Sequence, residues 1–134
     1  MYGNHTVRHK SLPDLSDDEI KSELLTLHQT IKEKFNYEMK YMRPPMGEFS
    51  QRTLIDTANL GYKTVMWSFA YKDWEEKNQP AEKDAINIIT ENFHSGEIML
   101  LHGNSKTNTN LLPEIIKQAR EQGYTFSSLD EYEE

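Results

Sequence analysis

The sequence contains no cysteine among its 134 residues, which excludes disulfide bonds and metal sites built on thiolate ligands. It also has no cluster of basic residues, because acidic residues outnumber basic ones by 22 to 15 and the net charge is -7. Nucleic acids are bound by concentrated positive charge, so this balance argues against a nucleic-acid partner. No apolar run approaches the roughly 20 residues of a membrane span, and the first residues form no apolar core of a signal peptide.

The remaining composition is that of an ordinary folded chain. Hydrophobic residues make up 36% and charged residues 28% of the sequence, which is typical of a soluble domain rather than a disordered segment. A chain of 134 residues is long enough to bury one core and too short for two domains. We therefore expect a single domain over residues 1–134.

The hydrophobic pattern alternates between the periods of helices and strands. The longest helical pattern begins at a capping box formed by Ser16 and Glu19, and its apolar stripe extends from Ile20 to Phe35. Such alternation indicates parallel strands joined by crossover helices, and hence an α/β fold. Helices are predicted over residues 16–35, 51–60, 80–93 and 112–121, and strands over residues 39–42, 62–69, 98–101 and 124–126.

Side chains capable of chemistry follow the predicted strands. Arg43, Asp73 and His102 each lie just beyond the C-terminal end of a strand, and the residues before His5 and His9 form the stub of another. The C-terminal ends of parallel strands meet on one face, where α/β folds assemble their sites. We therefore expect these residues to share one face.

His5 and His9 form the most distinctive polar pair. Neutral imidazole is the commonest protein ligand of zinc, so two histidines four residues apart indicate half of a metal site. A catalytic zinc usually takes three protein ligands, and the third must come from elsewhere. The alternative interpretation is that both are solvated histidines with no shared role.

Four short segments carry a resemblance to a known family. Residues 5–9 read H-T-V-R-H, residues 43–47 R-P-P-M-G, residues 73–74 D-W and residues 100–102 L-L-H. In this order they resemble motifs of the polysaccharide deacetylases of carbohydrate esterase family 4. Residues 67–74 are especially similar to the branch that acts on N-acetylmuramic acid of peptidoglycan, the delta-lactam branch.

The resemblance implies metal-dependent hydrolysis of N-acetyl groups on a cell-wall glycan, which releases acetate and leaves a free amine. His5 and His9 would bind a divalent metal, with zinc as the expected ion. His102 would be the general acid that protonates the departing amine. Asp73 would hold and tune that histidine, and Arg43 would pair with the family's catalytic aspartate.

The resemblance also implies substrate contacts and a location. Trp74 and Leu100 would wall the pocket for the acetyl group, and the backbone N–H of Met46 would help to hold the oxyanion. The expected partner is an N-acetylated glycan, with peptidoglycan as the first candidate. The usual location of the family's members implies that the full-length parent acts in the cell envelope or is secreted.

The chain also departs from the family pattern. The family's T-F-D-D-G motif, which supplies the aspartate base and an aspartate metal ligand, is absent from this sequence. Met46 replaces the usual aromatic residue, and Ala70 replaces an aspartate of many relatives. The resemblance therefore implies the C-terminal part of a deacetylase catalytic domain, a partial (β/α) barrel that lacks its N-terminal strands.

Each site residue has a structural alternative. A histidine at a strand end, such as His102, is satisfied by a neighbouring carbonyl group. Asp73 could be a turn residue beside a core tryptophan, and Arg43 a surface residue on a rigid proline loop. His94 is most simply a residue at a helix C-terminus, where a partly charged imidazole suits the helix dipole.

Two further functions compete with the deacetylase. One is a non-catalytic, truncated remnant that acts as a carbohydrate-binding or structural module, and the other is a different metal hydrolase on the same scaffold. Because the aspartate base and the third metal ligand are missing from this sequence, we expect little or no deacetylation by the isolated chain. For the same reason, we expect it to bind divalent metal only weakly. We also expect self-association through the sheet edge that the missing strands leave uncovered.

Overall fold

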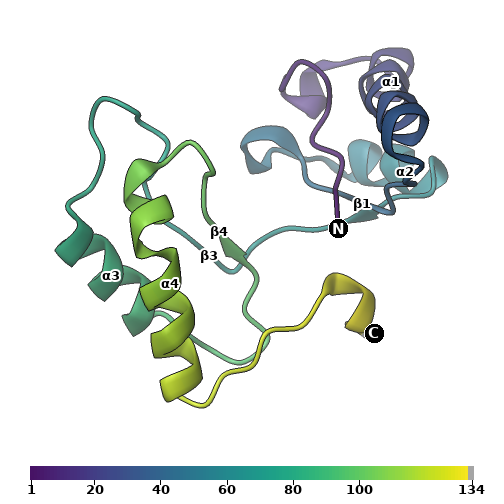
Figure 1. The fold of residues 1–134 in the computed structure, drawn as a ribbon. Coiled ribbons are helices and arrows are strands. Elements are labelled where there is room, and N and C mark those ends of the chain that lie inside the picture. The colour runs from purple at the N-terminus through teal and green to yellow at the C-terminus, as the bar shows by residue number, and fades with distance from the viewer. Residues whose placement is uncertain (133–134) are drawn as a thin grey trace. The chain divides into compact units, whose positions relative to one another are not determined.

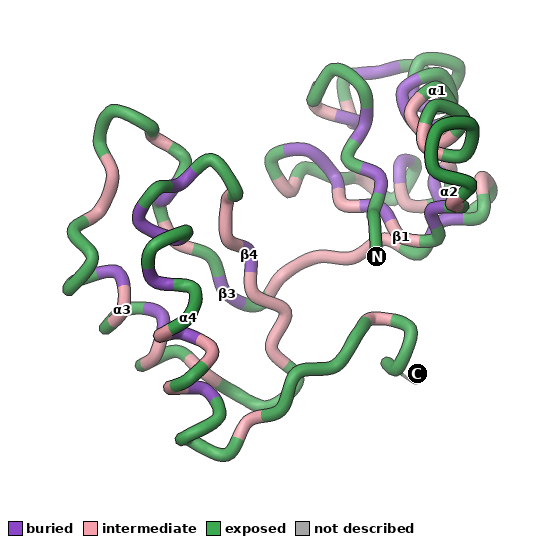
Figure 2. The backbone as a smooth tube through the Cα atoms, in the orientation of Figure 1, coloured by how far each residue is buried: buried purple, intermediate pink, exposed green. Residues whose placement is uncertain are grey.

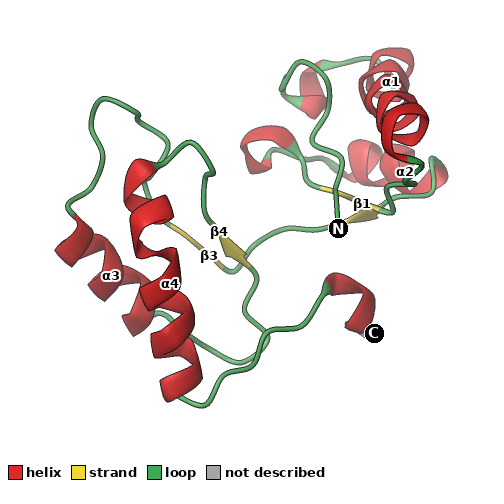
Figure 3. Ribbon diagram, in the orientation of Figure 1, coloured by secondary structure: helices red, strands yellow, loops and turns green. Residues whose placement is uncertain are grey.

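The computed structural model describes residues 1–132, which belong to two compact units, Met1–Met66 and Trp67–Glu134. Strands and helices alternate in both units (Figures 1 and 3). The expected single domain over residues 1–134 stays a prediction. The helices are α1 (Asp17–Phe35), α2 (Gln51–Asn59), α3 (Glu82–Glu91) and α4 (Lys106–Glu121), and the strands are β1 (Tyr41–Met42), β2 (Lys63–Thr64), β3 (Phe69–Ala70) and β4 (Met99–Leu100).

The strands of the first unit run parallel. β1 pairs with β2, with Met42 opposite Thr64, and Asn4 forms an isolated parallel bridge with Met42. The residues before His5 are therefore the strand stub that the sequence predicted. Parallel neighbours need a crossover connection, and α1 and α2 supply the two connections.

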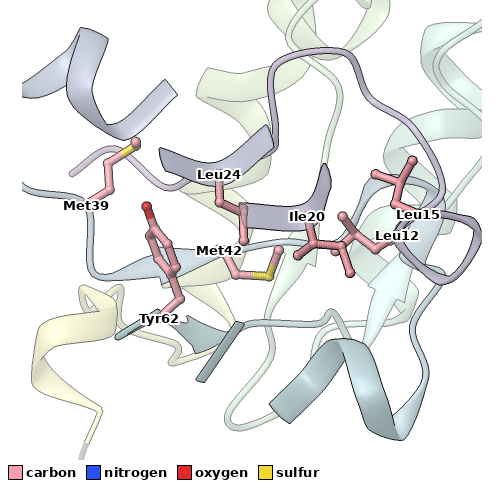
Figure 4. Close-up of a cluster of buried hydrophobic side chains, with 7 residues drawn as sticks. All are labelled: Leu12, Leu15, Ile20, Leu24, Met39, Met42 and Tyr62. Carbon is pink, nitrogen blue, oxygen red and sulfur yellow. The ribbon is translucent and has the colours of Figure 1, made fainter. Parts of the chain in front are cut away.

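Helix α1 packs the core of the first unit. Its capping box is confirmed: the hydroxyl of Ser16 accepts the N–H of Glu19, and the carboxylate of Glu19 accepts the N–H of Ser16. The predicted apolar stripe is buried at Ile20. The prediction is wrong at Phe35, the last residue of the helix, whose side chain is 62% exposed. The core that this helix covers comprises Leu12, Leu15, Ile20, Leu24, Met39, Met42 and Tyr62 (Figure 4).

The second unit repeats the arrangement with β3 and β4. These strands pair in parallel, with Ala70 opposite Leu100, and α3 is the crossover between them. Helix α4 packs against α3, and the facing sides of the two helices bury Ala85, Ile89, Leu111 and Ile115 (Figure 2).

Two strand predictions are wrong. The apolar run over residues 62–69 is not one strand, because β2 ends at Thr64 and β3 begins at Phe69, in the other unit. Residues 124–126 form no strand. Tyr124 instead packs its ring against Phe93 and donates its hydroxyl to the carbonyl of that residue at 3.1 Å.

Helix α4 begins six residues earlier than the apolar pattern predicted. The hydroxyl of Ser105 caps it by accepting the N–H of Asn108 at 3.1 Å. Its first two turns carry polar side chains, including the buried Thr107 and Asn108, so a search for apolar periodicity missed them. None of the helices formed by residues 1–132 has the length and apolarity to span a membrane.

Candidate functional site

The two histidines of the first unit lie together on one loop. The ring centroids of His5 and His9 are 4.8 Å apart, with an interplanar angle of 79°. Thr6 and His9 have φ angles of 66° and 53°, a region that residues other than glycine seldom adopt. The hydroxyl of Thr6 accepts the N–H of His9 at 3.0 Å. This backbone curls the loop so that both imidazoles face the same space.

The ring of His5 has a defined orientation. Its Nδ1 lies 2.7 Å from the backbone carbonyl of Arg43, the first residue after β1. A carbonyl only accepts hydrogen bonds, so in the neutral ring the proton is on Nδ1 and the lone pair is on Nε2. Metal-bound histidines commonly hold their second ring nitrogen in this way.

A buried carboxylate anchors the loop between the histidines. Glu23 of α1 is 1% exposed and accepts the backbone N–H groups of Val7 and Arg8 at 2.9 and 2.8 Å. The side-chain Nε of Arg8 donates to the other oxygen of Glu23. Burial alone would raise the pKa of Glu23, but the hydrogen bonds and charge of Arg8 and the N–H of Val7 outweigh it and lower the pKa.

A buried amide anchors the start of the same loop. Asn4 is 1% exposed and donates its Nδ2 to the carbonyl of Leu24 at 2.8 Å and to the hydroxyl of Tyr62 at 2.9 Å. Its Oδ1 accepts the N–H of Thr6 at 3.0 Å. The start and the middle of the histidine loop are therefore fixed by buried polar side chains, neither of which the sequence analysis had placed at the site.

Arg43 and Met46 lie on the proline loop after β1. Arg43 is partly buried, and this burial lowers its pKa, although a guanidinium stays charged at neutral pH. Met46 has a φ of 58° and an exposed side chain within the 3-10 helix Pro45–Gly47. The structure thus places both residues of the predicted motif on one tight turn.

The second unit joins Asp73 to His102, the pairing that the family resemblance implied. Asp73 is fully buried at 0% exposure, three residues after β3, and its Oδ1 lies 2.6 Å from Nδ1 of His102. Its Oδ2 accepts the backbone N–H of His102 at 2.7 Å. The imidazole itself is partly exposed, with its side chain 41% accessible. A carboxylate that holds Nδ1–H leaves Nε2 as the nitrogen available for chemistry.

Trp74 and Leu100 flank this pair differently. The indole of Trp74 is 50% exposed and meets the ring of His102 edge-on, with centroids 5.7 Å apart. Leu100 is only 9% exposed in β4. Trp74 therefore offers apolar surface beside the histidine, whereas Leu100 is almost entirely buried.

The sequence analysis missed Asn108 at this site. Its Nδ2 donates to Oδ2 of Asp73 at 2.5 Å and lies 3.4 Å from the carbonyl of His102. The hydroxyl of Tyr71 donates to its Oδ1. The signal was present, because a Ser-x-x-Asn segment shortly after a strand-end histidine marks a helix start close to that histidine.

Tyr71 gives a prediction about alkaline pH. Burial, and then the charge of Asp73, raises the pKa of Tyr71 to about 12. Because the folded pKa exceeds the unfolded one, the stability it contributes is present below pH 10 and lost as the pH rises through about 12. A spectrophotometric titration of wild type minus Tyr71→Phe should show a phenolate band developing well above pH 10. A band with its midpoint at pH 10 would contradict the hydrogen-bonded phenol.

The residues present fit part of a metal site. Two imidazoles on one loop, one of them orientated by a carbonyl, are suitable donors for zinc or a similar divalent ion. Within residues 1–132, no three side chains from His, Cys, Asp and Glu lie together as a complete site. His5 and His9 could thus supply two ligands of an ion whose remaining protein ligand lies elsewhere.

Comparison with known proteins finds similarity to polysaccharide deacetylases. A family model described as polysaccharide deacetylase matches residues 2–65. The chain is 42% identical to an uncharacterized 30.6 kDa protein of Geobacillus stearothermophilus and 38% identical to the peptidoglycan-N-acetylmuramic acid deacetylase PdaA of Bacillus subtilis. Each alignment covers 98% of this chain and 50% of the relative, so the chain spans about half the length of these relatives.

Solved structures extend the likeness to the fold. The structure of PdaA, a family 4 carbohydrate esterase, matches with a TM-score of 0.90 at 38% identity, over 96% of this chain and 55% of the other. A family 4 pseudoenzyme from Bacillus anthracis matches with a TM-score of 0.88 at 27% identity, over 96% of this chain and 44% of the other.

The chain belongs to the polysaccharide deacetylases of carbohydrate esterase family 4, and it corresponds to a C-terminal portion of such an enzyme. Its fold is accordingly part of the family's (β/α) barrel, and the predicted fold class is confirmed. Its relatives in this family include proteins described as peptidoglycan deacetylases.

Proposed function

We propose that this chain supplies the general-acid half of a metal-dependent deacetylase that hydrolyses N-acetyl groups of peptidoglycan. The observation that carries the proposal is the fully buried Asp73 held 2.6 Å from Nδ1 of a partly exposed His102. Two of the relatives support peptidoglycan as the substrate, because they are described as peptidoglycan deacetylases. The parent protein would accordingly act at the cell envelope.

His102 would assist the step of amide hydrolysis in which the C–N bond breaks. When water adds to the acetyl carbon, the C–N bond breaks readily only if the departing nitrogen receives a proton. The imidazolium form of His102 holds one proton on Nδ1 against Asp73 and presents the other on Nε2 to that nitrogen. After the transfer, the ring is neutral and keeps its Nδ1 proton, and Nε2 takes up a proton from solvent before the next turnover.

Trp74 would orient the acetyl group beside this acid. Its half-exposed indole lies edge-on to His102 and offers an apolar surface against which the methyl group could pack. Leu100 would form another part of the wall around the acetyl group. In the first unit, Arg43 would pair with the aspartate base of the complete enzyme, and the N–H of Met46 would donate to the oxyanion.

His5 and His9 would hold the divalent metal, with zinc as the expected ion, together with a ligand from the part of the enzyme outside this chain. When bound, such an ion supplies Lewis-acid polarisation of the acetyl carbonyl and acidifies a water molecule. The chain's own contribution is to fix the two rings: Arg43 orientates His5 through its carbonyl, and Glu23 and Asn4 anchor the loop.

The test is a chimera in which this chain replaces the matching half of PdaA, to which it is 38% identical over 132 residues. The chimera should release acetate from N-acetylated peptidoglycan, lose this activity with a chelator and regain it with zinc. The isolated chain should release little or none. A soluble, folded chimera that releases no acetate at any metal concentration would contradict the proposal.

A second candidate is a non-catalytic module that binds glycan. It is favoured by the likeness to a family 4 pseudoenzyme at a TM-score of 0.88. The same chimera separates the two candidates, because a binding module would retain peptidoglycan in a pull-down while releasing no acetate.

A further inference from the structure

We propose that Asn108 is a positioning residue of the acid site: its side-chain amide fixes the carboxylate of Asp73 and thereby the proton on Nδ1 of His102. The inference rests on the proposed function, because it matters for catalysis only if His102 is the acid. None of the four sequence motifs contains Asn108, which lies in the first turn of α4 at 6% exposure.

The carboxylate of Asp73 needs an external anchor. Asp73 lies in the loop after β3, three residues beyond the strand, so no helix or ladder holds its side chain. Two N–H donors meet at its Oδ2: the backbone of His102 at 2.7 Å and the amide of Asn108 at 2.5 Å. With Oδ2 fixed and the carboxylate planar, Oδ1 has a single direction, toward Nδ1 of His102 at 2.6 Å.

The orientation of the Asn108 amide follows from its partners. A carboxylate only accepts, so the amide nitrogen of Asn108 must face Asp73 and its oxygen must face Tyr71. The raised pKa of Tyr71 keeps its phenol protonated at neutral pH, so the phenol donates to that oxygen. The hydrogen bonds therefore run in one sense, from Tyr71 to Asn108 to Asp73, and from His102 to Asp73.

The consequence is a fixed tautomer of His102. Neutral imidazole carries its proton on either nitrogen, and a nearby hydrogen-bond acceptor decides which. Here, Oδ1 of Asp73 selects Nδ1–H, which leaves Nε2 for the substrate nitrogen. A carboxylate released by Asn108 could rotate away from the ring, and the selection would weaken. A purely structural Asn108 would affect stability without changing the tautomer.

The experiment measures the tautomer directly in the full chain. Nitrogen-15 NMR of the neutral His102 ring gives the ratio of Nδ1–H to Nε2–H in the wild type and in Asn108→Leu, which has a similar volume and no donor. We expect a predominantly Nδ1–H ring in the wild type and a ratio lower by about fivefold or more in the variant, as expected for a lost charge-assisted hydrogen bond.

The matched control is Asn110→Leu, the same substitution two residues along α4. Asn110 is exposed and donates to Glu82 at 2.7 Å, away from the acid site, so the ratio should stay at the wild-type value. If Asn108→Leu does not fold, Tyr71→Phe removes the donor behind the amide while keeping the ring, and it should lower the ratio by about twofold.

An unchanged ratio in a folded Asn108→Leu chain, or in Tyr71→Phe where the first variant does not fold, would overturn the inference. This measurement needs neither metal nor turnover. It therefore fails independently of the proposed function, which depends on acetate release by the chimera.

Discussion

Replacing Glu23 with alanine should lower the free energy of unfolding of the chain by about 2–3 kcal/mol. The carboxylate is 1% exposed and accepts the backbone N–H groups of Val7 and Arg8. Alanine would leave these donors without their acceptor and leave a cavity beside Leu24. Because the Arg8 side chain is 55% exposed, water can solvate its guanidinium, which keeps the cost below that of a fully buried ion pair.

Urea unfolding monitored by circular dichroism would measure this loss, with Glu33→Ala as the matched control. Glu33 lies on the same helix, is exposed and contacts only Gln29 among the hydrogen bonds described. Its removal should change the unfolding free energy by no more than about 0.5 kcal/mol. Equal effects of the two substitutions would contradict the anchoring role of Glu23.

The pH dependence of Glu23→Gln tests the same contact by its charge. The pKa of Glu23 lies below its ordinary value of 4.5, so its stabilisation is present above that pH and lost as the pH falls through the folded value. Between about pH 5 and about pH 3, the wild type should therefore lose more stability than Glu23→Gln. Parallel curves would mean that the carboxylate carries no net favourable interaction.

The sequence contained the signal for Glu23, although the sequence analysis did not place it at the site. Residues 20, 23, 24 and 27 follow the spacing of one helix face, so a charged side chain at position 23 borders the apolar stripe. What the sequence could not give was the partner, because Val7 and Arg8 reach Glu23 only through the left-handed backbone at Thr6.

The second unit shows which features can be predicted from the sequence even where the strands are short. Topology predicted that Asp73 and His102 share one face, and the family resemblance implied that they pair. They are neighbours in the structure because each follows one of two adjacent parallel strands. Each strand is only two residues long, so the hydrophobic run over residues 98–101 located β4 but not its limits, and the run over residues 62–69 merged β3 with β2. Asn108 was missed because it belongs to polar turns of α4, where apolar periodicity gives no signal.

Replacing His102 with glutamine should lower kcat for acetate release by the PdaA chimera at least about 100-fold. Glutamine can still donate an N–H toward Asp73, so the loop keeps its hydrogen bond, but an amide cannot deliver a proton to the departing nitrogen. KM should change little, because proton donation acts in the transition state. His94→Gln is the matched control: His94 is exposed and contacts Ser68 and the carbonyl of Asn92, so the same substitution there should leave activity unchanged.

The choice of leaving group separates proton donation from general damage to the site. The amine of an N-acetyl sugar cannot depart without a proton, whereas the phenolate of an aryl acetate can. The chimera carrying His102→Gln should therefore lose far less activity on the aryl acetate than on the glycan. A loss of equal size on both substrates would show that the imidazole shapes the site, and the proton would then have to come from another group. The contrast depends only on where the Nε2 proton goes, because the Nδ1 side of the ring faces Asp73 whichever substrate is bound.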